Sequence, residues 1–460
     1  CSLNGGMAQS LGYAPATGPV NSSLLFIGEA LGEHEAIAGE PFVGDAGGML
    51  GTMFRRSSID RSNVRIDNAI RCCPPGNWLD GAPWQYSALT QCSQYLQETL
   101  HENHKVIVTL GGIALRQVLQ LTGDGISVKD FHGTVHRLPS DPAKFVVPTF
   151  HPSHLQRGAI NLLDVVRFDL DRAAAVARSG WNPSPVSIVQ DPPVDWFAQW
   201  IGRYLAQASA DPEGVWLAVD CETPDKAGGK DEGELTPEDQ STTILRLNFA
   251  CHPDEGVTVP YVGPYIALCE RLFAAPYIKV LWNKNYDRRR FLLAGHTIGG
   301  EWWDLMWAWH RLQSDLPRGL GFAAPFASDY GAWKHLGKLP GREAEYAAVD
   351  AFQTLRLAHY IVRILVEQGM WDVFERHTHQ LEEEVLRPAY DLGVLVDLPA
   401  LDAFHLHLDT VCGEKLAELK KLEAAGTLKP KHGYKTKPKG AKCLADVGAG
   451  HDGCAACQGI

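Results

Sequence analysis

Short apolar runs alternate with amphipathic stretches along roughly the first 180 residues of the chain. The apolar runs are nearly continuous, which is typical of strands buried on both faces of a sheet. The stretches between them repeat apolar residues every three or four positions, as amphipathic helices do. Such alternation predicts an α/β/α sandwich around a largely parallel sheet. The expected strands are 23–30, 64–70, 105–111 and 144–151, and the expected helices are 47–57, 88–103, 112–120 and 162–180.

A second alternating region predicts another α/β domain over residues 213–370, with a mixed sheet. Residues 181–212 separate the two regions and carry four prolines between positions 183 and 193, so we interpret them as a Pro-rich linker. Residues 371–460 are expected to be mostly helical. The second region should hold strands at 214–224, 243–251, 256–262 and 278–283 and helices at 265–275, 286–295 and 342–369.

Composition narrows the class of protein without identifying it. A chain of 460 residues, 45% hydrophobic and 21% charged, suits a globular protein of two to four domains. There is no apolar run of 18 residues and no signal peptide, so we expect no membrane partner and a cytoplasmic location in a bacterium or a virus-infected cell. Because the chain opens on Cys1 rather than Met, we expect a monomeric part of a longer protein.

Eleven cysteines and a net charge of −12 bear on cofactors and partners. Several cysteines are clustered, which favours metal or iron–sulfur ligation over disulfides. The net negative charge argues against a protein coated in nucleic acid. It does not exclude an enzyme that binds nucleic acid through a local basic groove. Much of the acidic charge lies in residues 225–240, which we interpret as a solvated loop.

Three polar loops follow strands of the first domain, namely "GEALGEHEAIAGEPFVG" from residue 28, "NAIRCCPPGN" from residue 68 and "HPSHLQRG" from residue 151. The carboxyl ends of parallel strands meet at one edge of a sheet, where α/β proteins bind their ligands. We therefore expect the three loops to converge on one site.

Taken together, and in this order, the three loops resemble the motifs of the uracil-DNA glycosylase superfamily, most closely its iron–sulfur-containing family 4. The resemblance covers about 170 residues. It implies that a base is flipped out of DNA and that its N-glycosidic bond is hydrolysed. Phe42 would stack on the uracil, Asn68 would read its polar edge, and His151 would donate to the anion that develops on the base. Glu29 would place the water and stabilise the sugar cation.

The resemblance also implies contacts to the nucleic acid outside the base. Asn77 is a candidate for contacting the base or the sugar, while Leu155 and Arg157 would wedge into or clamp the duplex. Two positions depart from the family pattern: Leu31 stands where the family has Pro, and Trp78 stands where it usually has Arg.

Each assigned residue also has a purely structural interpretation. The alternative for Phe42 is core packing, for Asn68 the capping of a turn, and for His151 a hydrogen-bonded loop position. The rival function for the first domain is accordingly a non-catalytic uracil sensor or DNA clamp, and Leu31 is the feature that favours it.

Family 4 enzymes carry a [4Fe–4S] cluster held by four cysteines. The resemblance implies Cys1, Cys72 and Cys92 as three of the ligands, with the remaining one expected upstream of the first residue. Cys73 stands where the family does not usually have Cys, and it is either a substitute ligand or a bystander.

Carboxylates are distributed through the second domain in three motifs. Asp220 and Glu222 lie two positions apart on an expected strand, so both face the same side of the sheet. Asp287 follows in "NKNYD", and Asp350 follows in "YAAVD". Four carboxylates from separate segments suit two divalent metal ions with oxygen ligands, which can hydrolyse a phosphodiester.

This ordered set resembles the DEDD-type 3′–5′ exonucleases with a tyrosine in the last motif, and best the proofreading domain of family A DNA polymerases. The resemblance implies a ribonuclease-H-like fold and two Mg²⁺ or Mn²⁺ ions on Asp220, Glu222, Asp287 and Asp350. Tyr346 would orient the attacking water, and Asn283 is a candidate substrate contact. The alternative is a degenerate domain with chance carboxylates.

The last segment, 371–460, resembles the entry into the polymerase domain of family A polymerases through "LEEEVLRPAYDLGVLVD". The catalytic carboxylates of a polymerase are not expected in this chain. Near the end, Cys443, His451, Cys454 and Cys457 form a candidate zinc site, since Cys-x2-Cys with a further Cys and His suits structural zinc. A tail without bound metal is the alternative. Six lysines between 428 and 442 would either contact phosphates or form a solvated linker.

These motifs predict a DNA replication and repair protein that excises uracil and proofreads 3′ ends as part of a larger polymerase. Its expected partner is single-stranded and uracil-containing DNA.

Overall fold

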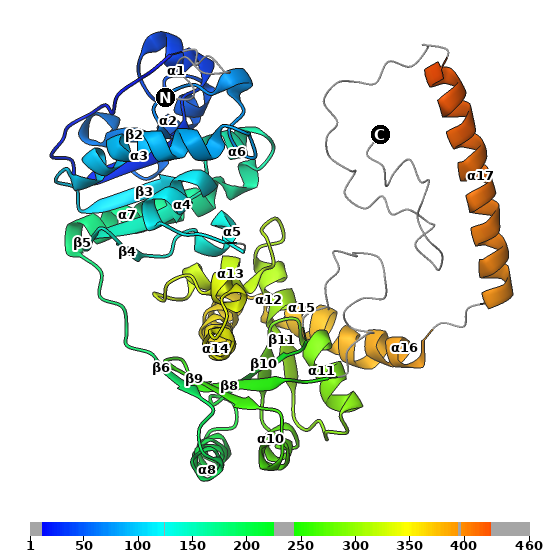
Figure 1. Ribbon diagram of the computed structural model, residues 1–460. Helices are drawn as coiled ribbons and strands as arrows, with labels where there is room; N and C mark the ends of the chain where they lie inside the picture. Colours follow the sequence, from blue (N-terminus) through cyan, green and yellow to red (C-terminus); the bar gives the residue numbers. More distant parts are fainter. Residues whose placement is uncertain (1–11, 124, 225–242, 394–396, 425–460) are drawn as a thin grey trace. The chain divides into compact units, whose positions relative to one another are not determined.

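The computed structural model describes residues 12–123, 125–224, 243–393 and 397–424 (Figure 1). Two compact units are present in the described chain. Residues 12–224 and 243–378 form the first unit, and the second begins at residue 379. The first unit contains both predicted α/β folds, each built on its own sheet.

The N-terminal sheet has the strand order β2-β1-β3-β5-β4 among the described residues. Strands β1, β2, β3 and β5 are parallel, and only β4 runs antiparallel to its neighbour. The expected parallel sandwich is therefore confirmed, with one short antiparallel edge strand added. The bounds are β1 Leu24–Ala30, β2 Arg65–Ile70, β3 Val106–Leu110, β4 His136–Leu138 and β5 Asp141–Thr149.

Alternation along the strands explains the two helical layers of this domain. Leu24 and Phe26 of β1 pack with helices α2 and α7, whereas Leu25 and Ile27 pack with α3 and α4 on the opposite face. Burying each such side chain contributes about 1.5–3 kcal/mol. The helices are α1 Glu33–Ala38, α2 Asp45–Arg56, α3 Gln85–His101, α4 Gly112–Leu119, α5 Val128–Phe131, α6 Pro152–Gln156 and α7 Leu163–Ser179.

The central sheet has the order β11-β10-β7-β8-β9-β6. Strand β8 runs antiparallel to both β7 and β9, while β10 and β11 run parallel to β7. This is the mixed sheet of a ribonuclease-H-like fold, with β6 added at one edge. The bounds are β6 Ser187–Gln190, β7 Leu217–Glu222, β8 Arg246–His252, β9 Glu255–Pro260, β10 Lys279–Leu281 and β11 Trp302–Asp304.

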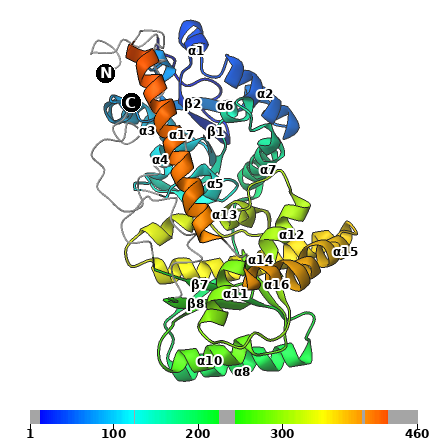
Figure 2. The ribbon, with the colours of Figure 1, turned by 90° about the vertical axis from the view of Figure 1, so that its right-hand side faces the viewer.

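Helices cover both faces of the central sheet. Helices α8 and α10 lie side by side on one face (Figure 2), where Trp200 and Phe273 pack against Leu217 and Phe249. The long helix α14 covers the opposite face through Val349 and other apolar residues. The bounds are α8 Val194–Ala210, α10 Pro264–Phe273, α11 Lys284–Leu293, α12 Leu305–Leu312, α13 Leu320–Ala323 and α14 Glu343–Glu367.

The interpretation of residues 181–212 as a linker is corrected by the structure. Strand β6 pairs in parallel with β9, and α8 begins directly after Pro193 and packs on the sheet. The prolines bracket these elements: Pro183 and Pro185 precede β6, and Pro192 and Pro193 separate it from α8. Proline interrupts pairing but also begins helices, so the same composition fits a linker and a pair of short, well-bounded elements.

Side chains of the N-terminal domain also contact the central domain. Nε2 of His132 lies 2.9 Å from the carbonyl oxygen of Phe322, and Arg172 donates to the carbonyl of Pro325 at 2.8 Å. On its other side, Nδ1 of His132 lies 3.1 Å from the buried carboxylate of Asp169. The two α/β folds therefore share a polar, buried contact through α5 and α13.

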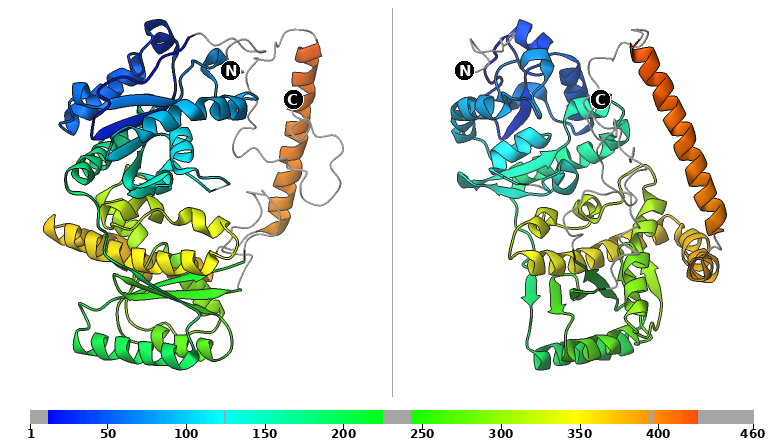
Figure 3. Two further views of the ribbon diagram at one scale, coloured as in Figure 1. Left: turned by 60° about the vertical axis from the view of Figure 1, so that its left-hand side comes forward. Right: turned by 45° about the vertical axis from the view of Figure 1, so that its right-hand side comes forward.

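The C-terminal residues are helical as far as the structure describes them. Helix α15 Trp371–Phe374 leads into π-helical turns at Glu375–Gln380 and Glu382–Leu386, followed by α16 Arg387–Leu392. Helix α17 Leu398–Ala424 is a single long rod (Figure 3). None of the helices in the described ranges is both long and apolar enough to cross a membrane. Four features of the sequence analysis lie outside the described residues. They are Cys1, the acidic loop at 225–240, the lysine-rich stretch, and the predicted zinc ligands Cys443, His451, Cys454 and Cys457.

Candidate functional sites

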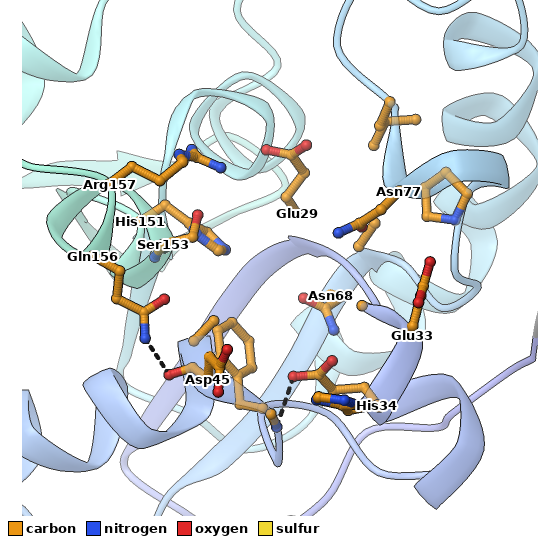
Figure 4. A pocket seen from close by; sticks show the side chains of 18 residues that line it. Glu29, Glu33, His34, Asp45, Asn68, Asn77, His151, Ser153, Gln156 and Arg157 are labelled. Atoms are coloured by element: carbon orange, nitrogen blue, oxygen red, sulfur yellow. Dashed lines mark hydrogen bonds between the residues drawn. The ribbon is translucent and has the colours of Figure 1, made fainter.

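A pocket of about 380 Å³ lies at the carboxyl ends of β1 and β2. Residue Gly28 of β1 pairs with Asn68 of β2, so the two loops that leave these strands start side by side. Figure 4 shows His151, Ser153 and Arg157 on one side of the pocket and Asn77 on the other. The three loops converge as expected, and the predicted residues that line the pocket are Glu29, Phe42, Asn68, Asn77, His151 and Arg157.

Phe42 forms one wall of the pocket and holds an unusual backbone conformation. Its φ is +57°, in the left-handed region that residues other than glycine adopt only under constraint. Arg61 donates to the carbonyl oxygen of Phe42 at 2.8 Å. A Cβ on Gly47 would lie 1.8 Å from that same oxygen, so glycine is required there. The ring is 5% exposed, and its centroid lies 5.9 Å from that of His151.

Asn68 is held rigidly at the pocket floor. The carboxylate of Asp67 accepts the backbone N–H of Asn68 at 2.8 Å and is itself paired with Arg71 and Thr99. The side-chain Oδ1 of Asn68 is buried and has no hydrogen-bond partner within the part of the chain that the structure describes. A buried unpaired amide oxygen costs about 1–3 kcal/mol, so a ligand that donates a hydrogen bond there recovers it.

His151 faces the pocket with a defined tautomer. The backbone N–H of Ser153 lies 3.2 Å from Nδ1 of His151, and Ser153 Oγ lies 2.7 Å from the same nitrogen. Because a backbone N–H can only donate, Nδ1 is an acceptor and the proton of a neutral ring resides on Nε2. Burial, with smaller contributions from Arg157 and His154, lowers the pKa of His151 to about 4. The imidazole is therefore neutral near pH 7 and presents Nε2–H as a donor.

Glu29 is the central carboxylate of this pocket. Burial raises its pKa above the usual value, Asp80 raises it further, and Arg157 opposes the shift. A second carboxylate, Glu35, lies deeper and accepts the backbone N–H of Gly44 at 3.0 Å, which fixes the loop before α2. Glu35 and Ser153 were given no role from the sequence, although both lie within the quoted loops.

Leu155 does not lie where the sequence interpretation put it. The side chain is 1% exposed and packs in the apolar core, so the expected wedge into DNA is corrected. Its neighbour Arg157 does line the pocket. Leu155 faces the core from within helix α6, whereas Arg157 caps the end of that helix and faces the pocket; the two-residue spacing by itself does not reveal this difference.

Leu31 and the cysteines lie behind the pocket wall. Leu31 is 1% exposed and packs with Cys73 and Ala14, apart from the residues that line the pocket. Cys72 and Cys92 share a different apolar cluster. Two thiols in one cluster fit a common iron–sulfur ligand set, whereas the separate position of Cys73 favours its interpretation as a bystander.

A second pocket, of about 480 Å³, lies in the central domain. Its lining includes all four predicted carboxylates together with Tyr346 and Asn283. Oxygens of Asp220, Glu222 and Asp350 lie within 4.8 Å of one another, close enough to share a metal ion. Asp287 differs from these three, because its Oδ1 accepts the backbone N–H of Cys221 at 3.0 Å.

Burial, together with the crowding of carboxylates, shifts the pKa values in this pocket. Burial, and then repulsion from Glu222, Asp287 and Asp350, raises the pKa of Asp220 well above its usual value. Burial raises the pKa of Glu222 to about 8, with Asp350 adding to the shift, and raises that of Asp287 to about 7. Bound divalent cations would remove this repulsion, so the donor set fits hard metal ions.

Two residues beside Asp350 were missed by the sequence interpretation. Trp333 donates Nε1–H to Asp350 Oδ1 at 2.5 Å, and Lys334 Nζ lies 2.8 Å from each oxygen of Asp350. Lys334 Nζ also lies 3.2 Å from the hydroxyl of Tyr346. Both residues come from the short 3₁₀ segment that precedes α14, where sequence periodicity gives no signal.

Comparisons with known proteins show the family of the N-terminal domain. The model of the family described as the uracil DNA glycosylase superfamily matches residues 15–168. The type-4 uracil-DNA glycosylase of Thermotoga maritima is 36% identical over 160 residues, which cover 34% of this chain and 78% of that protein. That of Archaeoglobus fulgidus is 32% identical over 144 residues, covering 31% of this chain and 70% of that protein.

Among solved structures, Escherichia coli RNase D, an exoribonuclease, is similar with 14% identity and a TM-score of 0.33. The match covers 43% of this chain and 50% of that chain.

Proposed function

Because the chain belongs, through residues 15–168, to the uracil-DNA glycosylase superfamily, we propose that its N-terminal domain excises uracil from DNA. The observation that carries this proposal is the buried Oδ1 of Asn68 without a partner among the described residues, at the floor of a pocket walled by Phe42 and His151. An extruded uracil presents a flat face for stacking and an N–H on its pairing edge for that oxygen.

We propose a step in hydrolysis for each of these residues, supported by their place in the lining of one pocket. Nε2–H of neutral His151 donates to the oxygen on which negative charge develops as the glycosidic bond breaks. Glu29 as a carboxylate accepts a hydrogen bond from the attacking water and stabilises the sugar cation. Arg157 and Asn77 at the rim are proposed contacts to phosphate, sugar or base. The side chain of Leu31 packs with Cys73 and is not part of the pocket lining, which supports catalysis over the sensor alternative.

Release of free uracil from a single-stranded oligonucleotide tests this proposal. His151→Ala should slow release by about 10²-fold or more, as the loss of an oxyanion donor does. Wild-type protein that binds uracil-containing DNA tightly but releases no uracil would support the sensor instead.

We also propose that Cys1, Cys72 and Cys92 ligate an iron–sulfur cluster. The placement of the free cysteines Cys72 and Cys92 in one buried, apolar cluster supports it. Protein that also supplies the fourth cysteine ligand upstream of Cys1, purified anaerobically, should be brown and contain about four irons per chain. Cys92→Ser should lose iron, whereas Cys251→Ser in the central domain should retain it. Colourless, iron-free protein that folds normally would contradict the proposal.

For the central domain we propose metal-dependent 3′–5′ exonuclease activity on single-stranded DNA. Two Mg²⁺ or Mn²⁺ ions held by Asp220, Glu222, Asp287 and Asp350 would activate water and stabilise the leaving oxygen. Asp350 and burial raise the pKa of the Tyr346 hydroxyl, so it remains a hydrogen-bond donor that can orient water. Asn283, at a left-handed φ of +68°, begins α11 at the pocket edge and is a proposed substrate contact.

The exonuclease proposal is tested by digestion of 3′-labelled and 5′-labelled single strands with and without Mg²⁺. Asp220→Ala should abolish digestion, and Tyr346→Phe should lose only part of the rate. Digestion in the presence of excess chelator would place the active site elsewhere.

Proofreading within a family A polymerase is a further proposal, supported by residues 381–397 and the helical segment around them. The domain order of such a polymerase places this segment directly after the exonuclease. These 460 residues alone should incorporate no nucleotides into a primed template. Zinc binding by Cys443, His451, Cys454 and Cys457 stays a prediction, which zinc analysis of a Cys454→Ser variant would check.

A further inference from the structure

The pocket that holds the exonuclease carboxylates includes one acidic residue from the other domain. Asp130, in helix α5 of the N-terminal domain, lines it together with Lys334 and Asp350. A Cβ placed on Gly321 would lie 2.6 Å from Asp130 Oδ1 and 2.8 Å from Lys334 Cγ. The two side chains are therefore neighbours on either side of Gly321. The Asp130 carboxylate has no hydrogen bond to another side chain in the described ranges.

Lys334 forms an ion pair with the two carboxylate oxygens of Asp350, which a metal ion would also require as ligands. Its ammonium lies 2.8 Å from both Oδ1 and Oδ2 of Asp350, while Trp333 takes a further position on Oδ1. A divalent cation on Asp220, Glu222 and Asp350 would be within a few ångströms of this ammonium. Two cations at that separation repel strongly, and a carboxylate cannot direct the same lone pairs at both.

The ammonium requires another anionic partner once it leaves Asp350. Lys334 is a partly buried side chain, 22% exposed, so moving it without a partner would cost desolvation free energy. Asp220, Glu222 and Asp287 are expected to carry the metal ions, which leaves Asp130 as the remaining carboxylate of the pocket. Of the charges that act on Asp130, Lys334 is the largest favourable one.

We propose that Lys334 is a built-in counter-cation that exchanges from Asp350 to Asp130 when the carboxylate site takes up a divalent cation. The N-terminal domain then sets the metal affinity of the central domain, because α5 supplies the acceptor for the displaced lysine. Asp130 is a positioning residue in this scheme and does not touch the metal. The inference rests on the proposed exonuclease function only in that the carboxylates bind divalent cations.

Mn²⁺ binding to the full chain, followed by the electron paramagnetic resonance signal of free Mn²⁺, tests the exchange without an activity assay. Lys334→Met should tighten Mn²⁺ binding by about tenfold or more, because the competing charge is gone. Lys334→Arg should keep affinity near that of the wild type. Lys338→Met is the matched control, because Lys338 lies beside Gly125 and is absent from the lining of the carboxylate pocket, and it should leave Mn²⁺ affinity unchanged.

The double mutant separates exchange from simple charge attraction. With Lys334 present, Asp130→Asn should weaken Mn²⁺ binding several-fold; in the Lys334→Met background it should have little effect. If Asp130→Asn weakens binding equally in both backgrounds, or has no effect in either, the exchange is wrong. Unchanged affinity in Lys334→Met would also overturn it. Absence of Mn²⁺ binding by both wild type and Lys334→Met would instead overturn the proposed metal site. Circular dichroism confirms that each variant is folded.

Discussion

The backbone N–H of Ser153 lies 3.2 Å from Nδ1 of His151 and thereby fixes which ring nitrogen of the histidine carries the proton. This contact caps α6 at its first turn, so one local interaction both begins the helix and orients the imidazole. The backbone donor does not depend on the identity of residue 153, whereas the second contact comes from the serine hydroxyl.

Ser153→Ala should therefore reduce uracil excision only modestly, by less than about tenfold, because the backbone donor remains. His151→Ala should lose about 10²-fold or more. Single-turnover release of uracil checks both. A Ser153→Ala enzyme as impaired as His151→Ala would show that the hydroxyl, and not the N–H, controls the tautomer.

The loss of uracil excision at acid pH should report the protonation of the Glu29 carboxylate. Its pKa is raised by burial and by Asp80, so the carboxylate is protonated, and activity lost, at a pH above 4.5. Protonation of His151 follows at lower pH, near 4. Asp80→Asn should move the acid limb of kcat/KM to lower pH, most clearly at low salt. Asp141→Asn, a partly exposed carboxylate that pairs with Lys144 outside the pocket lining, is the control, and an equal movement in both variants would contradict the assignment.

Gly28→Ala should block the base pocket. A Cβ there would lie 2.3 Å from Asn68 Oδ1 and 2.5 Å from the Phe42 ring. Because strand β1 itself tolerates alanine, the variant should fold while uracil excision falls by at least about 10²-fold, the scale that small misplacements of reacting groups produce. Gly48→Ala, where a Cβ meets nothing within 4 Å, should leave excision unchanged. Normal excision by Gly28→Ala would show that the base binds elsewhere.

Leu155→Ala should destabilise the fold, because Leu155 packs in the core. Truncating a residue that wedges into DNA would instead leave the stability of the fold unchanged. Truncating a leucine that is 1% exposed costs about 2–5 kcal/mol in the free energy of unfolding. Arg157→Ala should instead weaken DNA binding with little change in stability. Chemical denaturation and a DNA-binding titration distinguish the two, and an unchanged unfolding midpoint for Leu155→Ala would restore the wedge interpretation.

Asp220→Asn should raise the thermal unfolding temperature at pH 8 without metal. The folded-state pKa of Asp220 is raised, so wild-type stability falls as pH rises from the unfolded value near 3.8 through the folded one. The gain from Asp220→Asn should therefore be larger at pH 8 than at pH 5. Mn²⁺ should stabilise the wild type more than the variant. Calorimetry checks these outcomes, and a gain independent of pH would show that the buried negative charge of Asp220 is not its source.

The two sheets and the grouping of most candidate site residues could be predicted from short-range patterns in the sequence. Alternating apolar runs predicted both sheets, because strands buried on two faces must be continuously apolar. The order of three loops placed Glu29, Phe42, Asn68 and His151 at one pocket, since parallel strands bring their carboxyl ends together. The resemblance of three carboxylate motifs to the DEDD exonucleases placed Asp220, Glu222 and Asp350 in one site, and their oxygens lie within 4.8 Å of one another.

Only the tertiary structure decided features that depend on packing between distant segments. Leu155 and Arg157 are two positions apart in polar surroundings, and only their neighbours in space make one core and the other rim. The prolines around β6 are compatible with a linker when the sequence is considered alone. The pairing of β6 with β9 in the structure shows that they bound a strand. Lys334 and Asp130 lie more than 200 positions apart and meet near Asp350 only because α5 packs on α13. Local propensity carries no information about such contacts, because their free energy arises from burial and charge that exist only after the chain has folded.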